Sequence, residues 1–161
     1  VFEQFDDILG GATYANHNRH HYGYHYPRSL ETAQQCLESM EEFEYIYKSS
    51  IYSDFDNYYC ISKNDTKTNP DEYISFCEEA GLNFKHEWPS DGILNKSKIA
   101  LSLKVNEAVY DFQILKKIIK QRLNNTSNVK IKLNTKVTSG KLLDNEVKSI
   151  VAYENGIKYP F

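Results

Sequence analysis

The sequence has few cysteines and no long apolar run. Cys36, Cys60 and Cys77 are its only cysteines and form no Cys-x-x-Cys pair. The sequence therefore predicts neither a disulfide framework nor a zinc site, and a reducing, cytoplasmic location suits it best. The longest apolar stretches, near 98–105 and 147–153, are far shorter than the roughly 20 residues needed to cross a bilayer. We therefore expect no membrane-spanning helix.

Positive charge is also scarce. Lys and Arg number 19 against 22 Asp and Glu, which gives a formal net charge of -3 over 161 residues. Because no basic run collects on one stretch, we expect no nucleic-acid partner. The 40% hydrophobic content is ordinary for a folded domain that buries a core.

Three amphipathic helices are predicted from caps and apolar spacing. Ser29 can cap a helix that runs to about Tyr47, Asn69 can cap one that ends at Gly81, and Asp111 can cap a third. Apolar residues recur at threes and fours in each. These residues are Leu30, Ala33, Leu37, Met40 and Tyr47 in the first, Tyr73, Ile74, Cys77 and Ala80 in the second, and Leu115, Ile118, Ile119 and Leu123 in the third.

Several strands are expected between these helices, and the clearest is 99–105, which alternates apolar and polar side chains. We expect residues 6–18 to form a loop and Asn155-Gly156 to form a hairpin turn followed by a last strand. The composite is a mixed α/β fold, either one domain or parts of two interleaved ones. The other expected strands are 1–5, 57–62, 129–133 and 146–153.

Polar, cationic and aromatic side chains gather in the segment 16–28, which suggests a bound polar ligand. His17, His21 and His25 have a helical spacing that could place three imidazoles together. We reject a metal site, because Gly23 and Pro27 disfavour a helix and no carboxylate lies among the ligands. A loop whose histidines and tyrosines merely bond the backbone is the alternative.

This segment resembles the D-amino-acid oxidase and glycine oxidase superfamily of FAD-dependent oxidoreductases. It is most similar to bacterial members with an Arg-x-His-x-Gly-x-His-Tyr-Pro-Arg signature. Weaker similarity extends to 109–111 and to 129–137, a strand and turn that would reach the adenine. The residues that carry the resemblance are Gly11-Ala12-Thr13, Asn16, Asn18-Arg19, His21-Tyr22-Gly23, His25-Tyr26-Pro27-Arg28-Ser29 and Thr32.

The resemblance implies an FAD-dependent oxidoreductase that oxidises a C–N bond of a small amine or amino acid by hydride transfer to flavin. Its fold would be part of a Rossmann-like FAD-binding domain with an interleaved antiparallel substrate-domain sheet. Residues 1–30 would form the FAD-binding loop region, 31–110 the substrate region, and 111–161 the return to the FAD domain. The alternatives are a carbohydrate-biosynthesis oxidoreductase of unknown substrate and a non-enzymatic binding module.

The resemblance also implies roles for individual residues. Glu3, at the end of a second strand, would bind ribose, and Arg19 would place a fixed charge near the flavin. Thr13 replaces the family's usual serine, and His20 replaces an apolar residue, which leaves open whether His20 or His21 points inward. The remaining cofactor-binding candidates are Gly11, Ala12, Asn16, Asn18 and Val137, and the catalytic candidates are His21, Tyr26 and Arg28.

The glycine-rich GxGxxG turn that receives the pyrophosphate of a dinucleotide does not occur in the sequence. The chain also opens on Val1 rather than Met and stops at Phe161. We therefore expect an internal piece of a longer enzyme, one that would bind FAD poorly alone.

Overall fold

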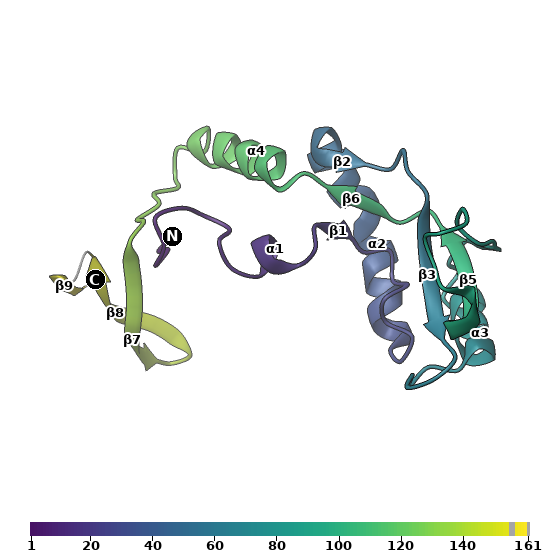
Figure 1. Cartoon of the computed structure of the whole chain (residues 1–161). Helices are drawn as coiled ribbons and strands as arrows, with labels where there is room; N and C mark the ends of the chain where they lie inside the picture. Colours follow the sequence, from purple (N-terminus) through teal and green to yellow (C-terminus); the bar gives the residue numbers. More distant parts are fainter. Residues whose placement is uncertain (155–156, 161) are drawn as a thin grey trace. The chain divides into compact units, whose positions relative to one another are not determined.

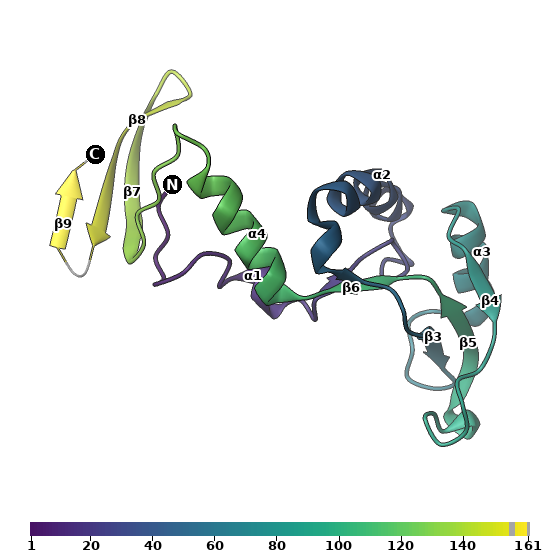
Figure 2. The same ribbon diagram turned by 90° about the horizontal axis from the view of Figure 1, so that it is seen from above.

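The computed structural model describes residues 1–154 and 157–160, and it divides the chain into two compact units. The first combines Val1–His17 with Phe112–Phe161, and the second is Asn18–Asp111. The described residues form helices and three antiparallel sheets of three strands each, so the expected mixed α/β character is confirmed (Figures 1 and 2). No helix in the described part of the chain is long and apolar enough to span a membrane.

The core of the second unit lies between a helix and a sheet. The sheet has the order β3 (Asn57–Ser62), β5 (Ile99–Val105), β4 (Phe84–His86). Alternation along β5 buries Leu101, Leu103 and Val105, as the sequence predicts. They belong to one apolar cluster with Tyr73, Phe76 and Cys77 of α3 (Pro70–Glu79), which lies alongside the sheet in Figures 1 and 2.

Helix α2 (Leu30–Tyr47) begins and ends where the caps and periodicity predict. The Ser29 side chain accepts a hydrogen bond from Thr32 N at its first turn. Ala33 is fully buried, and a Cβ added at Gly23 would lie 3.0 Å from it. Gly23 also has a φ of 115°, so a side chain at this position would meet both crowding and backbone strain. The preceding loop can therefore approach α2 closely.

A smaller sheet in the second unit has the order β1 (Arg19–His20), β6 (Ala108–Tyr110), β2 (Ile51–Tyr52). A short 3-10 helix, Lys48–Ser50, joins α2 to β2, and a second, Lys96–Lys98, precedes β5. Residues 106 and 107 join β5 to β6, so this connection links the two sheets of the unit.

The first unit contains α1 (Ala12–Ala15), α4 (Phe112–Asn124) and the meander of β7 (Thr135–Leu143), β8 (Glu146–Glu154) and β9 (Ile157–Pro160). Its N-terminal segment pairs in parallel with the segment before β7 through the bridge Phe2–Lys132. Glu3 N donates to Lys132 O, and Lys132 N donates to Val1 O, both at 2.9 Å. The N-terminal residues therefore lie beside Lys132, which is far away in the sequence.

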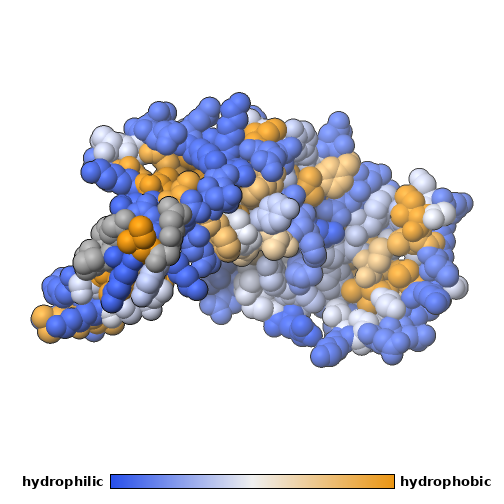
Figure 3. All heavy atoms as spheres, turned by 60° about the vertical axis from the view of Figure 1, so that its left-hand side comes forward, coloured by the Kyte–Doolittle hydropathy of each residue, from blue (hydrophilic) through white to orange (hydrophobic). Residues whose placement is uncertain are grey.

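Apolar side chains remain at the surface of the first unit. The exposed fraction is 67% at Leu142, 63% at Val147 and 60% at Ile157, and orange side chains reach the surface in Figure 3. Ala152 and Thr135, in contrast, are buried. The meander therefore contributes less to the core than the sheet of β3, β4 and β5.

The three expected helices and the strands expected at 57–62, 99–105 and 146–153 are confirmed. The expected strand at 1–5 makes only the bridge Phe2–Lys132, and the nine-residue strand β7 is not among the expected strands. The third helix begins directly after Asp111, and a last strand, β9, is present. The expected loop 6–18 contains the four-residue helix α1, and 129–133 makes a single bridge rather than a full strand. The expected Asn155-Gly156 turn lies outside the described residues.

Replacement of Ser29 by Ala should lower the free energy of unfolding by about 1 kcal/mol, because it removes the N-cap acceptor of α2. Ser39→Ala is the matched control, since Ser39 lies inside the same helix and its hydroxyl donates to the carbonyl of Cys36, three residues earlier. Urea unfolding of both variants measures the difference. Equal loss of stability in the two would contradict a capping role.

Candidate functional site

The candidate site is built around Glu107, a buried carboxylate in the connection from β5 to β6. Its side chain has no exposed surface. Tyr59 donates its hydroxyl to Glu107 Oε2 at 2.7 Å, and the Tyr22 N–H donates to Oε1 at 3.2 Å. Arg19 Nη1 lies 3.4 Å from Oε2 and donates to the Tyr59 hydroxyl at 3.0 Å. A buried charge needs such partners, and here one cation and two neutral donors supply them.

Strand pairing fixes this carboxylate in place. Antiparallel pairing sets Arg19 opposite Val109, and Asn57 opposite Val105. The Asn57 side chain also donates to the backbone carbonyl of Glu107 at 3.1 Å. Glu107 is therefore held from β1 on one side and from β3 on the other.

The tyrosines of the site stay protonated near neutral pH. Burial, followed by the charge of Glu107, raises the pKa of Tyr59 far above its usual value. Burial and then the hydrogen bond to Glu44 do the same to the pKa of Tyr22, whose hydroxyl donates to Glu44 Oε1 at 2.7 Å. Both hydroxyls therefore act as donors to carboxylates rather than as anions.

Two neighbouring histidines face different carboxylates. His21 Nδ1 lies 3.6 Å from Glu107 Oε1, and His20 Nε2 lies 3.5 Å from Glu44 Oε1. Both nitrogens are buried and have no hydrogen-bond partner among the described residues. Burial is the main reason that the pKa of His20 is lowered. The His20 side chain is only 8% exposed, whereas that of His21 is 23% exposed.

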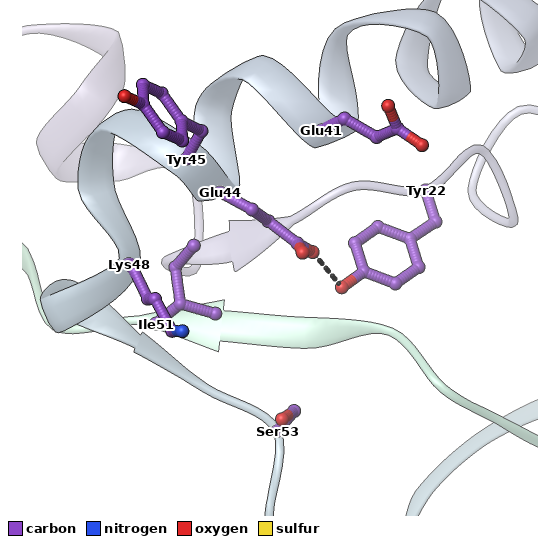
Figure 4. Close-up of a pocket in the computed structure, with 7 residues that line it drawn as sticks. All are labelled: Tyr22, Glu41, Glu44, Tyr45, Lys48, Ile51 and Ser53. Atoms are coloured by element: carbon purple, nitrogen blue, oxygen red, sulfur yellow. Dashed lines mark hydrogen bonds between the residues drawn. The ribbon is translucent and has the colours of Figure 1, made fainter.

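Open cavities border the site. One, of about 580 Å³, lies between α2 and β2, and Figure 4 shows Tyr22 and Glu44 pointing toward one another within it. A second, of about 770 Å³, is also lined by Tyr22 and Glu44, and a third, of about 270 Å³, is bounded by the two histidines and by α2. The first is lined by Tyr22, Glu41, Glu44, Tyr45, Lys48, Ile51 and Ser53, and the third by His20, His21, Ser39, Glu42, Phe43, Ile46 and Tyr47.

Five predicted site residues lie in the second unit, and two of them meet. Arg19 and His21 converge on Glu107. The Tyr26 ring lies 5.8 Å from that of His21. Arg28 is exposed, and the Asn18 carbonyl accepts from Tyr110 N at 2.8 Å, which ties the start of β1 to β6.

The other six predicted residues lie in the first unit. Glu3 is partly exposed, and its Oε1 accepts from Phe5 N at 3.0 Å. Gly11 and Asn16 flank α1 and are exposed, and Val137, on β7, is 43% exposed. Ala12 and Thr13 form the first turn of α1, exposed and half-buried respectively.

Sequence reasoning missed Glu107, Glu44 and Tyr59. Glu107 follows an alternating strand and precedes another apolar segment. An acidic residue between two buried strands is therefore the sequence signal that could have identified it.

Among the residues that the structure describes, no three His, Cys, Asp or Glu side chains are grouped so as to hold a metal ion.

Comparison with known proteins adds no relative. No protein family, no curated protein and no solved structure matches this chain.

The protein should lose stability as the pH falls from about 6.5, the unperturbed histidine pKa. Because the pKa of folded His20 is lowered, the unfolded chain binds the proton more readily, and unfolding is favoured as the pH drops from the unfolded toward the folded pKa. His20→Phe should flatten this part of the profile. The exposed His17 is the matched control, as His17→Phe.

Thermal unfolding between pH 7.5 and pH 5 measures the effect. The lowered pKa values of Asp7, Asp56 and Asp91 change stability only near and below about 3.9, the ordinary aspartate pKa, outside this window. An unchanged pH slope in His20→Phe would show that His20 does not cause it.

Proposed function

We propose that this chain is part of an FAD-dependent oxidoreductase that oxidises a C–N bond of an amine or amino acid. The observation that carries the proposal is the position of Glu3. It lies in a segment that pairs in parallel with Lys132, directly before the Gly10-Gly11 loop and the motif at 11–29. Dinucleotide-binding folds use parallel strands and place an acid at the end of the second one, where it bonds ribose hydroxyls.

The residues of the first unit are compatible with the ribose end of such a cofactor. Glu3 uses one oxygen to accept from Phe5 N, and a carboxylate has about four acceptor sites, so capacity for ribose hydroxyls remains. A Cβ built on Gly11 would meet nothing within 4 Å, so the backbone there is open to close approach. The missing GxGxxG turn means that pyrophosphate binding would need residues outside this sequence.

In the proposed reaction, bound FAD supplies the acceptor for a hydride and its electron pair. The chain's own residues would bind and orient the amine. His21 and Tyr26 are the proposed substrate-side residues with adjacent rings, and Arg28 is an exposed cation suited to a substrate carboxylate. Arg19 pairs with Glu107, which offsets its charge and makes it a weaker source of positive potential than an unpaired arginine.

A non-enzymatic binding module is the second candidate. The specific observation in its favour is that Arg19, Tyr22 and Tyr59 all bond Glu107 or each other. These internal bonds explain much of the polar motif without a cofactor. Such a module would be colourless and would gain no flavin bands.

The test is the visible absorption spectrum of the full-length gene product purified from cells, with the released cofactor identified by mass. Bound FAD is expected. Glu3→Gln should weaken FAD binding by about tenfold or more, because a hydrogen bond to a charged group contributes roughly 1.5–3 kcal/mol.

Asp6→Asn is the matched control, since Asp6 is an exposed acid three residues further along the chain. It should leave FAD affinity unchanged. A folded, colourless protein that gains no bands when FAD is added would refute the proposed function and favour the binding module.

A further inference from the structure

The two histidines and the cavity of about 270 Å³ beside them form a feature that the proposed cofactor site does not use. His21 and Glu107 face one another at 3.6 Å, slightly beyond a direct hydrogen bond. Catalytic hydrogen bonds are often long in a ligand-free structure and shorten when a ligand binds. The pair has the arrangement of a base oriented by a buried carboxylate.

The protonation state of His21 follows from what its ring faces. Nδ1 is buried and faces Oε1 of Glu107. An ionised carboxylate accepts hydrogen bonds and cannot donate them. Nδ1 must therefore carry the proton. The other ring nitrogen, Nε2, then carries the lone pair. Because Nδ1 is buried, the 23% of the side chain that is exposed lies elsewhere on the residue.

The cavity beside His21 suits a small ammonium ion with an apolar substituent. Phe43, Ile46 and Tyr47 supply apolar wall, and Glu42 supplies a negative charge. His20 lines the same cavity with a side chain 8% exposed, but its Nε2 faces Glu44 at 3.5 Å, and Glu44 is not one of the residues that line the cavity.

We propose that His21 is the base that deprotonates an ammonium ligand in this cavity, and that Glu107 is its positioning residue. The ammonium N–H bond breaks, its electron pair stays on the amine nitrogen, and the proton forms a bond to His21 Nε2. The neutral amine and an imidazolium paired with Glu107 result. The choice of an amine rests on the proposed function, but the dyad and cavity do not.

Several charged groups and rings surround His21. Glu107 faces its Nδ1 with Oε1 from the β5–β6 connection, and Arg19 bonds the other oxygen of the same carboxylate. The rings of His25 and Tyr26 lie 5.6 Å and 5.8 Å away, and His20 precedes it on the chain.

The first experiment measures the tautomer of His21 by NMR with ¹⁵N-labelled histidine, which requires no flavin. The expected result is the Nδ1–H tautomer, and a smaller excess of that tautomer in Glu107→Gln, because a neutral amide is a weaker acceptor than a carboxylate. Tyr59→Phe is the matched control, because it removes one donor to Glu107 and keeps the carboxylate. An Nε2–H tautomer in the unmodified protein would overturn the proposal, even if Glu107→Gln fails to fold.

The second experiment titrates the same sample with n-butylamine, with sodium butyrate as the matched anion. Saturable shifts of the His20 and His21 signals by the amine alone are expected, and Glu42→Gln should weaken that binding by about tenfold. Equal shifts from butyrate, or none from the amine, would overturn the ammonium cavity. Neither outcome depends on FAD, so failure here is distinct from failure of the proposed flavoenzyme.

Discussion

The buried carboxylate of Glu107 is the interaction on which the second unit depends. It receives donors from β1, from the segment after β1 and from β3, so three stretches of chain converge on two oxygens. Removing one partner of a buried ion pair leaves an uncompensated charge, which costs far more than a surface pair contributes. Because residue 107 also connects β5 to β6, the same group ties together the two sheets of this unit.

This arrangement gives the adjacent histidines different environments. Successive side chains of an extended segment point to opposite faces, so His20 turns toward Phe43 and Glu44 of α2, while His21 turns toward Glu107. His20 is the buried side chain, and His21 remains partly exposed. A buried aromatic contact explains why a histidine can stand where an apolar residue is expected.

The parts of the fold that sequence patterns predict are those specified locally. Ser29 and Asn69 mark α2 and α3 because their caps lie within three residues of the groups they bond, and alternation marks β5. The strands of two or three residues carry no such pattern. In the sequence, Glu107 looks like an ordinary acidic residue of a loop. Its partners in the fold are Tyr59, 48 positions away, and Arg19, 88 positions away. Long-range pairing of this kind leaves no local signal in a single sequence.

Backbone conformation bears on two residues of the predicted cofactor motif. His17 and Asn18 have φ values of 56° and 55°, in the left-handed region that side chains other than glycine rarely adopt and that asparagine tolerates best. The boundary between the two units falls between these residues. The left-handed backbone therefore explains an asparagine at position 18. Its carbonyl also accepts a hydrogen bond from Tyr110 N, which holds the turn in place. In the part of the chain that the structure describes, the Glu3 side chain makes only a local bond to Phe5, which gives it no comparable structural explanation. For this reason the case for a bound nucleotide rests on Glu3 more than on the asparagines.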